Sequence, residues 1–326
     1  MTSVPLQLEI LDLRHFSAAS LRPLLETEAR VWSQRLEWDY RPSANLLLQY
    51  LDSRILPGYV AVENGRVSGY VFCVYEDRKA VIGDVFAILP QHGGSTSTDV
   101  GTKLLECLIE LLQHSPGVDR IESQLLLHPH GELERPFLVA GFKVHRRLFM
   151  RHDLLGNVPA PSVALPADLE MRSWREDDFN PAARLISAAY SGHLDSHIND
   201  QYRSVAGSLR FLHNIVRFPG CGYFDAAASR LLIRKGSNEF AGLVLCSRVR
   251  EDVAHVTQIC IAKEERGRGL GRLLIEHCAA DLKTQGFRAL TLTVTAGNEN
   301  AVSLYHRTDF QVTHDFDAML WQKTVG

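Results

Sequence analysis

A stretch rich in glycine and arginine follows an apolar run in the last third of the sequence. It reads "ICIAKEERGRGLGRLLIEHCAADL", from Ile259 to Leu282, and its second part has the apolar spacing of an amphipathic helix. Glycines leave out the Cβ atoms that would keep a ligand from the backbone, so consecutive N–H groups can converge on one anion. The helix N-terminus adds about half a positive charge. We therefore predict a pyrophosphate-binding loop formed by Arg266, Gly267, Arg268, Gly269, Leu270, Gly271 and Arg272.

Two other glycine-rich loops bind phosphates, and neither fits this stretch well. A P-loop needs GxxxxGK followed by serine or threonine, and that sequence does not occur in this stretch. A dinucleotide-binding loop needs GxGxxG directly after the first strand of its βαβ unit. Here the spacing is GxGxG, and the loop comes late in its half of the chain.

The pattern R-x-x-G-x-G after an apolar strand resembles motif A of the GCN5-related N-acetyltransferase (GNAT) family. Downstream, "NENAVSLYHRTDF" from Asn298 to Phe310 is similar to the family's N-x-x-A-x-x-L-Y…F segment. The resemblance implies acetyl-coenzyme A as co-substrate, no metal, and direct attack of an amine on the thioester in a ternary complex. One departure is Asp309, where the family usually has glycine; aspartate tolerates the left-handed conformation better than most residues.

The resemblance also implies roles for individual residues. Tyr305 corresponds to the tyrosine that gives a proton to the departing thiolate of the coenzyme. The strand before the loop carries a bulge in this family, and its freed amides bind the thioester carbonyl and the pantetheine arm. Those amides are carried over to Ile259, Cys260 and Ile261, and Asn298 is expected to face the pantetheine.

His255 is the candidate general base. A lysine-like amine has a pKa near 10.4, so a group that accepts its proton is useful at neutral pH. His255 lies six residues before Ile261, where histone-acetylating members of the family carry a glutamate. Strand alternation places His255, Thr257 and Ile259 on one side if the ladder is regular. The alternative is a histidine hydrogen-bonded within the sheet.

The acceptor pocket has a weaker signal. The stretch "YSGHLDSHINDQY", from Tyr190 to Tyr202, concentrates tyrosine, histidine and aspartate in the region that shapes this pocket in the family. Its polar members His193, Asp195, His197 and Asp200 could bind a cationic amine, or they could form a solvated loop.

The chain repeats one plan in its two halves. Each half has an expected strand (residues 80–88 and 253–262), then a glycine-containing loop, a helix (102–113 and 271–283) and another strand (120–127 and 289–295). The segment "LLGNVPAPSVALPADLE" between the halves indicates a linker. We expect an α/β protein of two tandem GNAT domains, residues 1–153 and 168–326 with a linker at 154–167, each a mixed, mostly antiparallel sheet flanked by helices.

The first half lacks the residues that would carry chemistry. Its loop "PQHGGSTSTDVGTK", from Pro90 to Lys103, has no arginine and contains Asp99, whose charge would repel a pyrophosphate. Phe137 stands five residues before Phe142, as Tyr305 stands before Phe310, so the proton donor is absent there. We predict a degenerate domain that keeps the fold without binding the coenzyme.

Composition limits the other possibilities. The chain of 326 residues has a net charge of −3 and no long apolar run, so we expect a cytoplasmic protein without nucleic-acid or membrane partners. The six cysteines form no CxxC pair, which favours reduced, buried thiols over zinc. The lead hypothesis is an N-acetyltransferase acting on a small-molecule or peptide amine, as a monomer or homodimer. The alternatives are a non-catalytic coenzyme-binding module and a small-molecule enzyme of the mycothiol-synthase kind, which shares the duplicated layout.

Overall fold

A computed structural model describes residues 8–88, 96–156, 158, 160–218, 220–237 and 239–323. The first part of the glycine loop in the first half, with Gly93 and Gly94, lies outside the described residues. The chain divides into two compact units: residues 1–36, 40–147 and 315–326 form the first, and residues 37–39 and 148–314 form the second. Within the described residues, no helix is both long enough and apolar enough to cross a membrane.

The sheet of the first unit is mixed and mostly antiparallel. Its strands follow one another in the order β1, β2, β3, β4, β5 and β13, and only β4 and β5 run parallel. The bounds are Leu8–Asp12 for β1, Gly58–Glu63 for β2, Arg66–Glu76 for β3, Lys79–Ala87 for β4, Arg120–Gln124 for β5 and Gln311–Gln322 for β13. The strand expected at 120–127 therefore ends three residues early, and Leu125 and Leu127 are buried beyond it.

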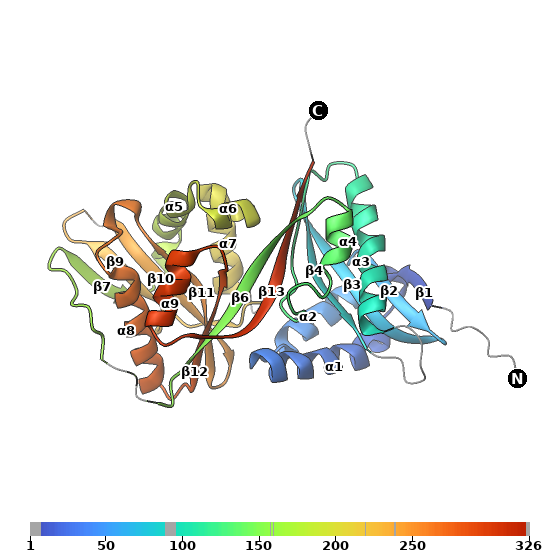
Figure 1. Ribbon diagram of the computed structural model, residues 1–326, viewed down its shortest axis with the longest axis horizontal. Helices are drawn as coiled ribbons and strands as arrows, with labels where there is room; N and C mark the ends of the chain where they lie inside the picture. Colours follow the sequence, from blue (N-terminus) through green and yellow to red (C-terminus); the bar gives the residue numbers. More distant parts are fainter. Residues whose placement is uncertain are drawn as a thin grey trace, which may run out of the picture. The chain divides into compact units, whose positions relative to one another are not determined.

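Helices cover both faces of this sheet (Figure 1). Strand β3 shows the two faces, because Val71 packs in the core with α3 (Ser97–His114) while the adjacent Tyr70 bonds to Glu28 of α1 (Ala18–Leu36). Helix α2 (Arg41–Asp52) packs on α1, and the short α4 (Glu134–Val139) packs on α3. Helix α3 begins five residues earlier than the apolar pattern indicates.

The early start of α3 explains Asp99. Thr96 and Asp99 form a capping box, in which Thr96 accepts from the Asp99 amide and the Asp99 carboxylate accepts from the Thr96 amide at 2.8 Å. Asp99 thus belongs to the first turn of the helix rather than to the loop, and its carboxylate occupies the helix N-terminus.

The second unit repeats the architecture. Its strands follow in the order β6, β12, β11, β10, β9 and β7, with β8 beside β10, and β11 and β12 are parallel. The bounds are Lys143–Asp153 for β6, Leu169–Ser173 for β7, Tyr223–Phe224 for β8, Arg230–Arg234 for β9, Phe240–Arg250 for β10, Val253–Ile261 for β11 and Ala289–Thr295 for β12. Both units therefore have the predicted mixed sheet flanked by helices.

Helices lie on both faces of the second sheet (Figure 1), and each face has its own apolar core. On one face, Leu273 and other residues of α8 (Leu270–Thr284) pack with Val244 of β10 and with α9 (Glu299–Arg307). On the other face, α5 (Phe179–Tyr190) and α7 (Val205–Arg217) pack on Leu243 and Leu245 of β10. The small helix α6 (Leu194–Ile198) follows α5.

The long strands β6 and β13 contribute residues to both units. Residues 143–147 of β6 belong to the first unit and 148–153 to the second, while β13 passes from the second unit at His314 to the first at Asp315. The compact units therefore have different bounds from the expected domains, and the division into functional domains stays a prediction.

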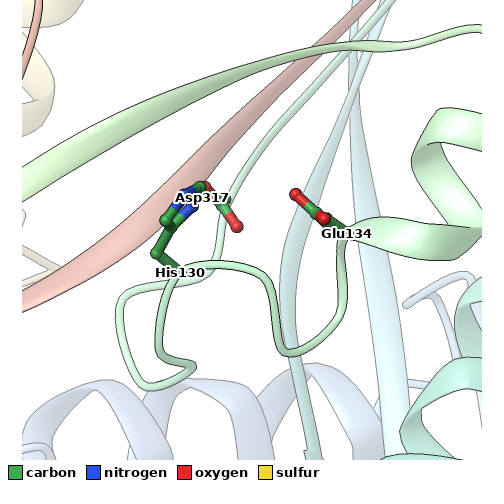
Figure 2. Close-up of side chains that lie close together, drawn as sticks. All are labelled: His130, Glu134 and Asp317. Carbon is green, nitrogen blue, oxygen red and sulfur yellow. The ribbon is translucent and has the colours of Figure 1, made fainter.

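Figure 2 shows His130, Glu134 and Asp317 close together in the first unit. The carboxylate of Asp317 is buried: Oδ1 lies 2.6 Å from His130 Nδ1, and Oδ2 accepts from the Gly131 amide at 2.8 Å. Both oxygens are thus bonded, and together they fix the turn before α4 on β13. Hydrogen bonds therefore account for the pairing of His130 with Asp317.

Candidate active site

A β-bulge separates β11 from β12. Leu245 pairs with Gln258 and Cys246 with Val256, so Thr257 is an extra residue on β11. The parallel pairs between β11 and β12 end at Val256 and Leu292, although β11 continues to Ile261. The last residues of β11 therefore have one side that no described strand covers, as the family resemblance implies.

The register decides which amides face that uncovered side. The amide of Ala262 donates to Ala241 at 2.9 Å, and bonded positions alternate along an antiparallel pair. Cys260 therefore donates its amide to β10, whereas Ile259 and Ile261 direct theirs away from β10. Ile259 donates to its neighbour's side chain, Gln258 Oε1, at 2.9 Å.

The bulge also corrects the expected position of His255. Ala254 and Val256 pack in the core with α8, and so do Ile259 and Ile261, because the extra residue shifts the alternation by one. His255 consequently lies on the opposite face from Ile259, and not on the same one. The assumption of regular strand pairing, on which the expected alternation rested, is therefore wrong for β11.

His255 is buried in an aromatic setting. Its Nδ1 lies 2.9 Å from Thr291 Oγ1, and its ring packs against Trp38 at 5.0 Å and Phe149 at 5.8 Å between centroids. The histidine is thus held within the sheet, on the face that also carries α5 and α7.

The glycine loop has the geometry of an anion site. Gly267 and Gly269 have φ of 82° and 76°, and Gly269 is the N-cap of α8 without a side-chain cap. Among the described residues, no hydrogen bond starts from the amides of Gly267 to Gly269, and the first amides of α8 have no partner within the helix. A Cβ placed on Gly267 would meet no atom within 4 Å. The loop therefore presents its amides to an open side, and these residues fit a pyrophosphate.

The arginines of the loop are already paired within the second unit. Arg266 donates to the Ala189 carbonyl at 2.8 Å, Arg268 to Asp168 at 2.7 Å and to Glu265, and Arg272 to Glu276 at 2.6 Å. Among the described residues, Arg266 thus bonds to a backbone oxygen, whereas Arg268 and Arg272 bond to carboxylates. The positive charge of the loop is thus smaller than its three arginines suggest.

Tyr305 is buried on α9, and its ring lies 5.8 Å from that of Phe310. Phe137 and Phe142 form the matching pair in the first unit, with centroids 5.1 Å apart. Asp309 has φ of 63°, so it adopts the left-handed conformation expected of the residue at this position.

Asn298 acts as the N-cap of α9. Its Oδ1 accepts from the Ala301 amide at 3.3 Å, and its Nδ2 lies 3.4 Å from His193 Nε2. The structure thereby joins the start of α9 to the tyrosine- and histidine-rich stretch. Asp195 of that stretch accepts from Thr295 Oγ1 at 2.5 Å. An open depression of about 310 Å³ is lined by Gly192, His193, Leu194, Gly297, Asn298, Glu299 and Asn300.

The four polar candidates of this stretch separate into two pairs. His193 and Asp195 contact the end of β12 and the start of α9. His197 is exposed on α6, and Asp200 is half-buried in the turn that follows. We therefore retain only the first pair as candidates for the acceptor side.

Sequence reasoning missed Tyr190 and Gln258. The Tyr190 hydroxyl donates to Gln258 Oε1 at 2.9 Å and lies 3.3 Å from the Ile259 carbonyl. Burial raises the pKa of Tyr190, and neighbouring Tyr202, Cys260, Asp195 and Tyr305 raise it further. The available signal was a polar residue, Gln258, inside an apolar strand.

In the first unit, side chains fill the space that corresponds to the gap between the ends of β11 and β12. Its parallel pairs end at Ile82 and Ser123, and counting from these pairs puts Leu127 and His128 where the second unit has Ala296 and Gly297. Leu127 is buried, and His128 Nε2 lies 2.8 Å from the Val85 carbonyl.

Comparisons with known proteins identify the family of this chain. The family described as "Acetyltransferase (GNAT) family" matches residues 172–310. A mycothiol acetyltransferase from Geodermatophilus obscurus is 31% identical over 234 residues, covering 70% of this chain and 71% of that protein. The chain belongs to the GNAT acetyltransferase family, and it is an N-acetyltransferase.

Solved structures show the fold. A GCN5-related N-acetyltransferase from Sphaerobacter thermophilus has a TM-score of 0.70 at 15% identity, over 98% of this chain and 96% of that one. A tandem GNAT protein from the clavulanic acid biosynthesis pathway has a TM-score of 0.60 at 14% identity, over 98% and 100%. The predicted fold of two tandem GNAT domains is therefore confirmed.

Proposed function

We propose that the second unit transfers an acetyl group from acetyl-coenzyme A to the amine of a small molecule. The observation that carries this proposal is the end of β11: beyond the bulge, the amides of Ile259 and Ile261 are directed away from β10, and the strand leads directly to a glycine loop at the start of α8. Acetyl-coenzyme A would supply an activated acetyl thioester. The loop amides and Arg266 would hold its pyrophosphate.

Different residues of the second unit carry out the separate steps of the acetyl transfer. The amides of Ile259 and Ile261 donate to the thioester carbonyl and the pantetheine, and so stabilise negative charge on the attacked oxygen. The acceptor nitrogen attacks the carbonyl carbon directly, the carbon–sulfur bond breaks, and Tyr305 gives its hydroxyl proton to the sulfur. His255 accepts the proton of the amine from the face that carries α5.

A covalent intermediate on Cys260 does not fit. Burial raises the pKa of this thiol, because the Cys260 side chain packs in the core with α5 and α7. The Cys260 amide donates to β10. A ternary complex is therefore the reaction path that we propose.

The small-molecule acceptor is supported by the similarity to a mycothiol acetyltransferase over 70% of the chain. The test is an initial-rate assay that follows coenzyme thiol release with a panel of amines: small thiol-bearing and amino-acid amines, a peptide N-terminus and a peptide lysine. We expect turnover with a small amine and loss of turnover in Tyr305→Phe. Coenzyme binding without turnover on the panel, unaffected by Tyr305→Phe, would instead indicate a non-catalytic binding module.

A further inference from the structure

The side chain of Gln258 occupies an amide that the reaction needs. Gln258 follows the bulged residue Thr257, and it is buried with 4% of its surface exposed. Its Oε1 accepts from the Ile259 amide at 2.9 Å and from the Tyr190 hydroxyl at 2.9 Å. Because a backbone N–H can only donate, these partners fix the carboxamide with its oxygen toward Ile259.

The other end of the same carboxamide is unsatisfied. Gln258 Nε2 is buried, and it has no hydrogen-bond partner among the described residues. Buried donors without a partner are rare in folded proteins, and each one is unfavourable. The carboxamide is therefore held at its oxygen alone, which makes it easier to displace than one bonded at both ends.

The first unit shows the same contact in a closed form. Its bulge lies between the pairs Val71–Val85 and Cys73–Ile82. On β4, the side chain of Asp84 accepts from the amide of the next residue, Val85, at 2.8 Å. Asp84 is also hydrogen-bonded to Glu28, and burial raises its pKa.

Both units thus place a side-chain oxygen on the amide that follows the bulge. In the first unit this oxygen is part of a buried network of acids, whereas in the second it belongs to a half-satisfied carboxamide. Both units therefore have this contact, but in the second unit another acceptor can displace the side-chain oxygen from the amide.

We propose that Gln258 sets how strongly the enzyme prefers the acylated coenzyme over the free thiol. This inference rests on the proposed function. A thioester carbonyl that accepts from the Ile259 amide must displace Oε1, and coenzyme A with a free thiol lacks this thioester carbonyl. Gln258 therefore weakens binding of acetyl-coenzyme A and leaves binding of coenzyme A nearly unchanged. The Tyr190 hydroxyl donates to the same Gln258 oxygen and so helps to keep it at the Ile259 amide.

Two substitutions at this position test the proposal, because they should act in opposite directions. Gln258→Ala removes the competing oxygen, so acetyl-coenzyme A should bind about 3- to 10-fold more tightly, which is the range of one net hydrogen bond. Gln258→Glu puts a charged acceptor on the amide, so at pH 8 acetyl-coenzyme A should bind about 3- to 10-fold more weakly. Coenzyme A should stay within about twofold in both variants. The measurement is calorimetric titration of the full chain with each ligand.

The ratio of the two affinities separates this effect from general damage. Gln285→Ala, at the exposed end of α8 in the same unit, is the control and should leave the ratio unchanged. The inference is overturned if the ratio is unchanged in both Gln258 variants, if both ligands shift together, or if the control shifts the ratio. Failure of the wild-type chain to bind either ligand would contradict the proposed function instead.

Discussion

The guanidinium of Arg266 donates from Nη2 to the backbone oxygen of Ala189, 2.8 Å away. Ala189 lies in the last turn of α5, directly before Tyr190. The first arginine of the glycine loop is therefore joined to the helix that leads into the acceptor side. A substitution of Arg266 should therefore weaken the binding of both substrates.

We expect Arg266→Ala to weaken acetyl-coenzyme A binding by about 10-fold or more, since a hydrogen bond to a charged group contributes about 1.5–3 kcal/mol. The KM for the amine should also rise, because Ala189 loses its bond. Arg184→Ala, an exposed arginine on α5, is the control. Unchanged binding in Arg266→Ala, measured by titration, would remove this residue from the coenzyme site.

Tyr305→Phe should lower kcat without unfolding the protein. The ring is buried and packs near Phe310, and phenylalanine keeps that packing, as Phe137 does in the first unit. Losing a positioned proton donor typically costs about 10²- to 10⁴-fold in rate. Steady-state kinetics and a thermal melt measure the two effects. A variant with wild-type kcat would show that the sulfur takes its proton elsewhere.

Cys260→Ala should keep most of the activity. Burial raises the pKa of the thiol, so it is a poor nucleophile at neutral pH. Initial rates at varied concentrations of both substrates should give intersecting lines, the pattern of a ternary complex. Parallel lines, together with an inactive Cys260→Ala, would indicate an acetylated cysteine.

The first unit should lose stability as the pH rises. Burial raises the pKa of Glu28 well above its usual value, and the nearby Asp84 raises it further. A raised folded-state pKa contributes stability that is full below the unfolded value of about 4.3 and is lost as the pH rises through the folded value. Each unit of difference corresponds to about 1.4 kcal/mol.

Glu28→Gln should flatten this decline, because an amide oxygen can still accept from Tyr70, whose hydroxyl lies 2.7 Å from Glu28 Oε2, and it carries no charge. Urea unfolding between pH 5 and pH 9 measures the free energy of unfolding. If the wild-type protein and Glu28→Gln have the same pH dependence, Glu28 does not titrate in this range.

Apolar periodicity was sufficient to predict the elements that carry the site. Strand β12 has the expected bounds of 289–295, and α8 starts at Leu270, between the last two glycines of the loop. Both signals are local, since each depends on which residues of one short segment face the core. The run Leu125–Leu127 shows the limit, because apolar residues can also fill a gap beyond the end of a strand.

The position of His255 could not be predicted by alternation. A bulge is one extra residue, and its effect on every earlier side chain depends on pairing with a distant strand, here β10. The contact of Gln258 with Tyr190 joins residues 68 positions apart and has no sequence pattern. By contrast, the pairs Arg268–Glu265 and Arg272–Glu276 have helical spacing and could have been inferred.

We propose that the second unit alone binds the coenzyme at its glycine loop, and one titration distinguishes this from binding elsewhere or at two sites. Gly267 and Gly286 have nearly equal φ, 82° and 85°, and an added Cβ would meet no atom within 4 Å at either position. Alanine should therefore strain both positions alike. Calorimetric titration with acetyl-coenzyme A should give one site per chain, lost or weakened at least about 10-fold in Gly267→Ala and retained in Gly286→Ala. Two sites per chain, or equal affinity in the two variants, would rule out the glycine loop of the second unit as the single coenzyme site.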